Sequence, residues 1–294
     1  MTIELNQEAI EDVRRTAREQ AERAFRTRSG RGRESSPARR ELAIVAEGDS
    51  WFDYPFFGDT LNILEDHHNY RVESAAQHGD RIEDMAYREQ QIDGFSSKLE
   101  RVKEDGRELA AILLSGGGND IVGPTLGFML EHAKSRSQGL NEDVLAGLVE
   151  VRLRLAFEAL IAKIDRATEL YFGRSAPIIV HGYGYAVPDG RGFLGGAWIL
   201  PGPWLEPQFR ARGYDPSDLE KNGEVVRQMI DSFNAMLEKL DASIPNVHYV
   251  DVRDELPSGD NYRDFWQDEL HPTDRGFRAV AAKIDQKIVE LRND

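Results

Sequence analysis

Short apolar runs alternate along the chain with longer segments in which apolar residues recur at helical spacing. The short runs have the length of buried strands and lie at 42–46, 71–76, 109–115, 177–181 and 247–252. Apolar positions three and four residues apart predict helices at 141–172, 222–240 and 274–291. This alternation predicts an α/β fold in which helical crossovers join five parallel strands.

One segment interrupts the alternation. Residues 183–216 combine glycine, proline and aromatic residues over a length beyond the usual connection in an α/β domain. Long irregular segments in compact domains often carry function, so we expect this loop to overhang a binding pocket, where it is a candidate lid.

The first forty residues differ from the rest of the chain in charge. Ten arginines and seven acidic residues lie within 1–40, whereas the remaining chain carries 27 basic and 45 acidic residues. Residues 7–25 have the composition of a helix, and 26–40 are rich in Arg, Ser and Gly, which predicts a flexible arm. We therefore divide the chain into an N-terminal helix with a basic arm at 1–40 and a main domain at 41–294. The arm is either a docking segment for an acidic surface or a solvated connector.

Composition and charge exclude several classes of protein. The chain has 294 residues, of which 40% are hydrophobic and 30% charged, as in an ordinary globular protein with a substantial core. The absence of cysteine excludes disulfides, thiolate nucleophiles and cysteine-ligated zinc. A net charge of -15 disfavours nucleic acid as a partner, and no apolar run approaches the roughly 20 residues of a membrane span. The first residues lack the pattern of a secretory signal, so we expect a cytoplasmic protein.

The first predicted strand ends in a glycine turn followed by a serine. Residues 43–50 (AIVAEGDS) place Ser50 at the carboxyl end of a parallel strand, where open α/β sheets bind their ligands. A serine hydroxyl is a weak nucleophile until a base takes its proton, and the base needs a third group to orient it. A histidine and a carboxylate should therefore accompany Ser50.

Among the seven histidines, His271 has the most suitable setting. It lies in 268–272 (DELHP), between an aromatic and acidic run and a predicted helix. From a loop held by proline, the Asp268 carboxylate can reach His271 Nδ1 while Nε2 points toward a serine. His67, His68, His132 and His248 fit surface or structural positions.

Two glycine-containing turns follow other predicted strands. In 114–120 (LSGGGND) the three glycines allow close approach of the backbone to a ligand, and Asn119 offers an amide donor to a developing oxyanion. Taken alone, this turn also fits a phosphate-binding loop or a simple tight turn, although no lysine follows it as in a P-loop. Gly79, in 77–80 (QHGD), could add a backbone N–H to the same hole.

In this order, the four segments resemble the four conserved blocks of the SGNH (GDSL-like) hydrolase family, over residues 42 to about 292. The matching positions are Gly48-Asp49-Ser50, Gly79, Gly117-x-Asn119-Asp120 and Asp268-x-x-His271-Pro272. The resemblance implies a flavodoxin-like three-layer α/β/α sandwich with a five-stranded parallel sheet. It implies that Ser50, His271 and Asp268 form a catalytic triad. It also implies that the N–H groups of Ser50 and Gly79, with the Asn119 side chain, form the oxyanion hole.

Two positions depart from the family pattern. Trp51 stands where leucine is the commoner residue, which should reshape the pocket floor and leave the chemistry unchanged. Ala75 stands where many members have an asparagine, so the supporting hydrogen bonds there are in question.

The resemblance implies hydrolysis of a carboxylic ester through an acyl-enzyme, with a small-molecule substrate and no metal or organic cofactor. We expect a short-chain acyl or aryl ester; sugar O-acetyl groups and lysophospholipids remain open within the same mechanism. The aromatic residues near the blocks either line an apolar groove or belong to the core. The candidates for substrate contact are Trp51, Phe52, Tyr54, Tyr183, Trp198 and Trp266.

Two other classes of function stay open. A metal-dependent phosphoesterase would use Asp49, Asp53, Asn119 and His271 as ligands, but the chain lacks histidine-rich spacing and Ser50 would have no role. The second class is a non-catalytic binding protein on the same fold. The sequence does not indicate an oligomeric state.

Overall fold

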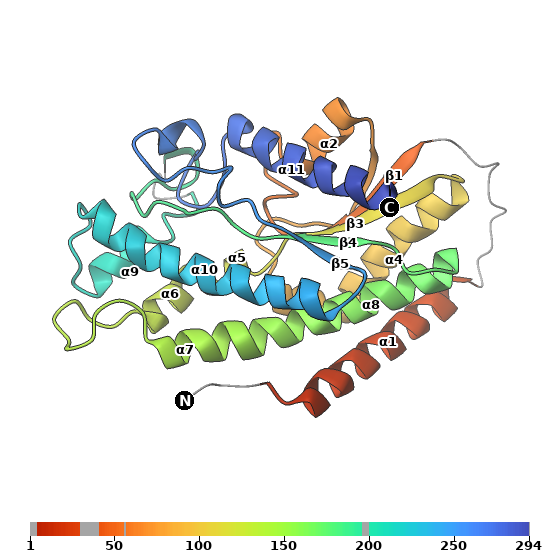
Figure 1. The fold of residues 1–294 in the computed structure, drawn as a ribbon, viewed down its shortest axis with the longest axis horizontal. Helices are drawn as coiled ribbons and strands as arrows, with labels where there is room; N and C mark the ends of the chain where they lie inside the picture. The colour runs from red at the N-terminus through yellow and green to blue at the C-terminus, as the bar shows by residue number, and fades with distance from the viewer. Residues whose placement is uncertain (1–4, 30–40, 56, 196–199, 294) are drawn as a thin grey trace.

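A single parallel sheet runs through the centre of the protein (Figure 1). The computed structural model describes residues 5–29, 41–55, 57–195 and 200–293. The strands are β1 (Leu42–Glu47), β2 (Arg71–Ser74), β3 (Glu108–Leu114), β4 (Ile178–His181) and β5 (Val247–Val250). Their order is β2-β1-β3-β4-β5, which is the order of flavodoxin-like folds. The predicted α/β fold with five parallel strands is therefore confirmed.

Helices cover both faces of the sheet. Helices α2 and α11 lie on one face and α4, α8 and α10 on the other, which gives three layers (Figure 1). The helical segments are α1 (Gln7–Ser29), α2 (Thr60–His68), α3 (Ile82–Tyr87), α4 (Glu89–Glu104), α5 (Gly118–Ile121), α6 (Pro124–Met129), α7 (Glu142–Ala146), the π-helical η1 (Gly147–Leu153), α8 (Arg154–Phe172), η2 (Phe193–Gly195), α9 (Glu206–Ala211), α10 (Leu219–Ser243), η3 (Tyr262–Asp264) and α11 (Asp274–Asn293). Over the described ranges, none of them is long and apolar enough to cross a membrane.

The register of the sheet brings the segments after its strands to one edge. Ala46 pairs with Ser74 of β2, and Glu47 pairs with Leu114 of β3. Strands β1, β3 and β4 are almost entirely buried, as expected for a parallel sheet that helices cover on both faces. The turns that follow these strands, which hold most of the candidate residues, therefore meet at the carboxyl edge.

Helix α1 packs against the outer side of α8 (Figure 1). Its inner face consists largely of alanines, including the buried Ala17 and Ala21, and these small side chains allow the two helices to approach closely. Ion pairs flank this contact: Arg14 lies 2.5 Å from Glu158 of α8, which is buried. The prediction that the arm begins at residue 26 is wrong, because 26–29 continue α1; residues 30–40, the rest of the expected arm, fall outside the described residues.

Candidate active site

Ser50 lies on the turn that follows β1 at the carboxyl edge of the sheet. The turn can approach β3 because residue 48 is a glycine: a Cβ at Gly48 would lie 2.9 Å from the Ser115 carbonyl oxygen. A larger residue would force the turn away from β3. The Gln77 N–H donates to the Gly48 carbonyl at 2.9 Å, which joins the serine turn to the turn that follows β2.

Ser50 contacts a histidine whose other ring nitrogen meets a buried carboxylate. The Ser50 Oγ lies 2.8 Å from His271 Nε2, and His271 Nδ1 lies 2.9 Å from Asp268 Oδ1. Asp268 is 1% exposed, and its Oδ1 also accepts the backbone N–H groups of Leu270 and His271 at 2.9 Å each. Because an ionised carboxylate only accepts hydrogen bonds, it keeps the ring proton on Nδ1 and leaves Nε2 to accept the serine proton.

Two aromatic rings flank the His271 imidazole. The Tyr54 ring stacks on it with centroids 4.6 Å apart, and the Trp204 ring meets it edge-on at 5.5 Å. The Tyr54 hydroxyl donates to Asp268 Oδ2 at 3.2 Å. Burial and then the nearby Asp268 charge raise the pKa of Tyr54, so the phenol stays protonated and donates. The sequence singled out Tyr54 as a substrate-contact candidate and gave no sign of its bond to Asp268.

Three N–H donors remain available beside Ser50. Asn119 Nδ2 donates one hydrogen to the Asp80 carbonyl at 2.9 Å, which fixes the amide and leaves its second hydrogen available. Gly79 has a φ of +83°, in the left-handed region that favours glycine. Within the described part of the chain, the backbone N–H groups of Ser50 and Gly79 have no hydrogen-bond partner. Donors of this kind suit a developing oxyanion.

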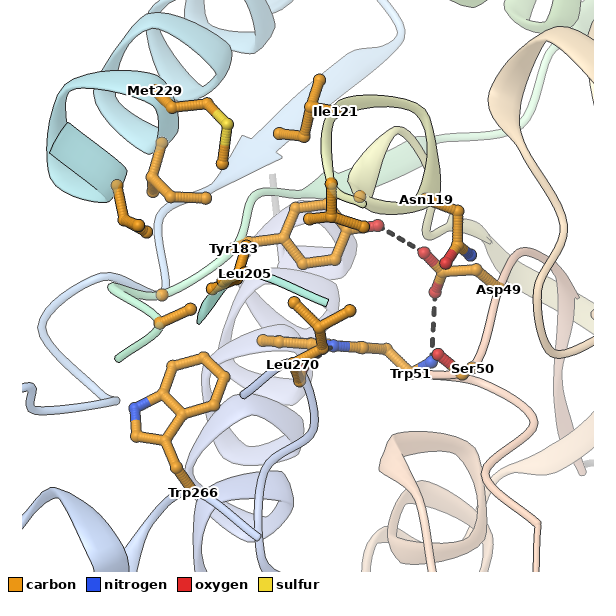
Figure 2. Close-up of a pocket in the computed structure, with 16 residues that line it drawn as sticks. Asp49, Ser50, Trp51, Asn119, Ile121, Tyr183, Leu205, Met229, Trp266 and Leu270 are labelled. Atoms are coloured by element: carbon orange, nitrogen blue, oxygen red, sulfur yellow. Dashed lines mark hydrogen bonds between the residues drawn. The ribbon is translucent and has the colours of Figure 1, made fainter. Parts of the chain in front are cut away.

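Asp49 ties together the ends of β1, β3 and β4. This buried carboxylate accepts the Ser115 hydroxyl at 2.7 Å. It also accepts the Trp51 N–H at 3.1 Å and the Tyr183 hydroxyl at 2.5 Å (Figure 2). Burial, followed by the Asp49 charge, raises the pKa of Tyr183 well above its usual value and keeps it a donor. The sequence did not reveal this link, because residues 49, 115 and 183 meet only in the folded sheet.

A small apolar pocket opens beside Ser50 (Figure 2). It has a volume of about 40 Å³. The side chains that line it are almost all apolar, and they include Trp51, Ile121, Val122, Tyr183, Ala186, Leu205, Val226, Met229, Ile230, Trp266 and Leu270. Three of the substrate-contact candidates therefore lie in its wall. Phe52 and Tyr54 do not line it, and Trp198 lies outside the described residues.

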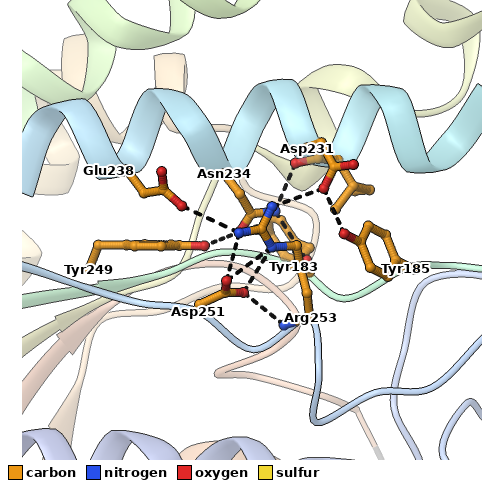
Figure 3. A network of polar contacts seen from close by, with 9 residues as sticks. Tyr183, Tyr185, Asp231, Asn234, Glu238, Tyr249, Asp251 and Arg253 are labelled. Carbon is orange, nitrogen blue, oxygen red and sulfur yellow. Dashed lines mark hydrogen bonds and ion pairs between the residues drawn. The ribbon is translucent and has the colours of Figure 1, made fainter.

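Helix α10 forms the far wall of this pocket, and a polar network holds the helix in place. The Arg253 guanidinium, beyond β5, lies 2.9 Å from Asp231 and 3.3 Å from Glu238, both on α10 (Figure 3). It also pairs with Asp251 at 2.6 Å, and this hydrogen bond is the main reason that the pKa of Arg253 is raised. The Tyr185 hydroxyl donates to Asp231 at 2.7 Å. The network fixes α10 against the strand ends from which the site is built.

The residues suggested as metal ligands do not form a cluster. Both the backbone N–H and Nδ1 of His78 lie 2.9 Å from Asp53 Oδ2, whereas Asp49 is enclosed by its three donors. Over the ranges that the structure describes, no group of three or more His, Asp or Glu side chains is arranged to hold a metal ion. The geometry therefore gives no support to the phosphoesterase alternative.

Comparisons with known proteins give a family. Residues 46–279, which include Ser50 and His271, match the model of the GDSL-like Lipase/Acylhydrolase family. Among solved structures, one described as a GDSL-like lipase from Parabacteroides merdae is 13% identical, with a TM-score of 0.49, covering 88% of this chain and 100% of its own. One described as a platelet activating factor from Streptococcus pneumonia is 15% identical, with a TM-score of 0.48, covering 96% and 93%. No curated protein sequence matches the chain. Since the family model spans most of the chain, this protein belongs to the GDSL-like lipase/acylhydrolase family of hydrolases.

Proposed function

We propose that the protein is a serine esterase that hydrolyses carboxylic esters with a short acyl group. The observation that carries the proposal is the continuous contact from Ser50 Oγ to His271 Nε2 at 2.8 Å and from His271 Nδ1 to Asp268 at 2.9 Å. This is the arrangement that makes a serine hydroxyl nucleophilic at neutral pH.

In the proposed mechanism, Ser50 Oγ attacks the ester carbonyl carbon while His271 Nε2 takes its proton. The carbonyl oxygen becomes an oxyanion and accepts hydrogen bonds from the Ser50 and Gly79 N–H groups and from Asn119. The C–O bond to the alcohol then breaks, and the alcohol leaves with the proton from His271. Water, activated by the same histidine, hydrolyses the acyl-Ser50 ester. Asp268 stays ionised throughout and stabilises the imidazolium.

The pocket size supports a short acyl group. A water-sized group needs about 10 to 15 Å³ by the same measure, so the pocket of about 40 Å³ holds roughly three such groups. An acetyl or propionyl chain fits this space, whereas a long fatty acyl chain does not. Phe57 is 44% exposed and stacks at 5.6 Å on Tyr54, whose ring stacks on His271, so it offers an apolar surface to an aryl alcohol.

The test is intact-mass analysis after treatment with a fluorophosphonate, together with hydrolysis of p-nitrophenyl esters of graded acyl length. We expect one adduct and acetyl esterase activity in the wild type, and neither in Ser50→Ala. Ser97→Ala is the matched control, because Ser97 lies on α4 and its hydroxyl only donates to the Gly94 carbonyl. An adduct that persists in Ser50→Ala, or a wild type that forms no adduct and whose hydrolysis depends on a metal, would contradict the proposal.

A further inference from the structure

Glu269 lies between Asp268 and His271 in the sequence, yet its carboxylate serves another part of the molecule. It is completely buried, and over the described residues it forms no ion pair with a basic side chain. Instead it accepts four backbone N–H groups from the loop 183–216. The donors are Gly190 at 3.0 Å, Trp204 at 2.6 Å, Leu205 at 2.7 Å and Glu206 at 2.9 Å. We call this set the Glu269 cluster.

A second set of bonds joins the same two segments. The Arg191 Nη1 donates to the Trp266 carbonyl at 2.9 Å and to the Gln267 carbonyl at 3.0 Å. In return, the Glu269 backbone N–H donates to the Arg191 carbonyl at 3.1 Å. The Arg191 side chain is itself fixed by Asp189, 2.5 Å from its Nε. The loop is therefore bonded to the segment that carries Asp268 and His271 at several points.

Two of the four N–H donors in the Glu269 cluster belong to residues that contact the pocket or the His271 ring. Leu205, which is fully buried, forms part of the pocket wall, and Trp204 meets the His271 ring edge-on. Figure 2 shows both Leu205 and Leu270 among the residues that line the pocket. The position of this wall relative to Ser50 thus depends on four N–H groups that converge on one carboxylate.

We propose that Glu269 is a positioning residue. It fixes Trp204 and Leu205, which we call the 204–205 wall, and thereby sets acyl-chain selectivity without touching the substrate. The inference rests on the proposed esterase function. Its physical basis is that the two carboxylate oxygens of Glu269 together accept all four N–H groups. A glutamine has one acceptor oxygen, and its NH₂ group would face two of the N–H donors, so the wall would move.

The experiment compares Glu269→Gln with Glu158→Gln as a matched control. Glu158 is also a buried glutamate, but it faces Arg14 at the interface of α1 and α8, away from the pocket. We expect kcat/KM for p-nitrophenyl acetate to fall between about 10-fold and 100-fold in Glu269→Gln, as a displaced wall misplaces the acyl group. The hexanoyl ester should lose much less, so the ratio of acetyl to hexanoyl kcat/KM should drop. The control should keep the wild-type ratio.

A second readout does not depend on activity. Amide hydrogen exchange of a peptide that spans 203–211 should become faster in Glu269→Gln and stay unchanged in Glu158→Gln and in Ser50→Ala. If Glu269→Gln does not fold, Glu269→Asp takes its place, because it keeps the carboxylate but shortens its reach. We then expect a smaller drop in the ratio of acetyl to hexanoyl kcat/KM and a smaller increase in the exchange rate of the 203–211 peptide.

The outcomes separate this inference from the proposed function. An unchanged acetyl to hexanoyl ratio in a folded Glu269 variant would overturn the inference, as would the same loss of ratio in Glu158→Gln. A wild type without adduct or turnover would refute the proposed function instead. The exchange result would then decide on its own whether Glu269 holds the 204–205 wall.

Discussion

Tyr54 combines two contacts with the proposed triad, and a single substitution separates them. Tyr54→Phe keeps the ring on the His271 imidazole but removes the hydroxyl that donates to Asp268 Oδ2. Asp268 keeps its bonds to His271 and to two backbone N–H groups, so the loss should be moderate. We expect kcat/KM to fall roughly fivefold, which corresponds to about 1 kcal/mol and is less than the roughly 1.5 to 3 kcal/mol of a hydrogen bond to a charged group, because the other donors to Asp268 remain.

Tyr70→Phe is the matched control for this measurement. Tyr70 is also buried and its hydroxyl donates to the Asp285 carboxylate at 2.8 Å, but it is not among the residues of the pocket. Its variant should keep the wild-type kcat/KM on the same ester. Equal effects of the two substitutions would show that Tyr54 acts only through general stability.

At the scale of single residues, the sequence indicates contacts within motifs better than contacts between them. Asp268 and His271 are three residues apart, so their contact follows from local geometry. The bonds of Tyr54 to Asp268 and of Tyr183 to Asp49 join positions more than a hundred residues apart. Such contacts depend on strand order and loop path, which no local pattern contains. The same holds for the Glu269 carboxylate, which the sequence shows only as a charged residue inside the DELHP motif.

Helix α10 combines a pocket wall with a rigid support. Met229 and Ile230 face the pocket, whereas Asp231 and Glu238 bind Arg253. A rigid helix cannot close a gap in the wall by shifting, so removing a wall side chain should leave added space.

Met229→Ala should therefore lengthen the acyl group that the enzyme accepts. We expect the ratio of hexanoyl to acetyl kcat/KM to rise several-fold, with a stability loss of about 2 to 5 kcal/mol from the deleted buried side chain. Met236→Ala is the control, because Met236 is fully buried on the same helix but does not line the pocket. It should lose similar stability and keep the wild-type ratio. A ratio that rises equally in both variants would assign the effect to loosening of the helix.

At the scale of elements, long periodic segments were predictable and short ones were not. The periodicity over 222–240 and 274–291 matches α10 and α11 to within a few residues at each end. Helices α3, α5, α6 and α9 have four to six residues each, too few to establish a period. The predicted helix at 141–172 forms as α7, a π-helical segment and α8, and residue periodicity does not distinguish a π-helical turn from an α-helical one.

Over the whole molecule, the sequence indicates the fold class more readily than how the outer layers pack. The alternation of strands and helices is enough for a parallel sheet, and its order follows from the family resemblance. The charge pattern of residues 7–25 does not say what α1 packs on. Its alanine-rich face meets α8, and Arg14, Arg18 and Glu22 pair with residues of that helix. This contact depends on charges of α8 that lie far away in the sequence.

Two buried ionisable groups at the centre of the molecule give the fold a pH dependence. Burial raises the pKa of Glu47, on β1, from 4.5 to about 8. Burial lowers the pKa of Lys163, on α8, from 10.5 to about 8. The stability linked to neutral Glu47 is full below pH 4.5 and is lost as the pH rises toward 8. The stability linked to neutral Lys163 has the opposite pH dependence: it is full above pH 10.5 and is lost as the pH falls toward 8, so it changes little between pH 5 and 7.

Glu47→Gln removes the first of these titrations and retains the shape of the side chain. We expect its free energy of unfolding, relative to wild type, to increase between pH 5 and pH 8 by an amount on the order of 3 kcal/mol. Denaturant unfolding at the two pH values measures this difference, and the comparison at each pH cancels the groups that both proteins share. Glu65→Gln, at a partly exposed glutamate, should show no such change. A constant difference between Glu47→Gln and wild type would mean that Glu47 is already ionised at pH 5, with Lys163 compensating its charge inside the fold.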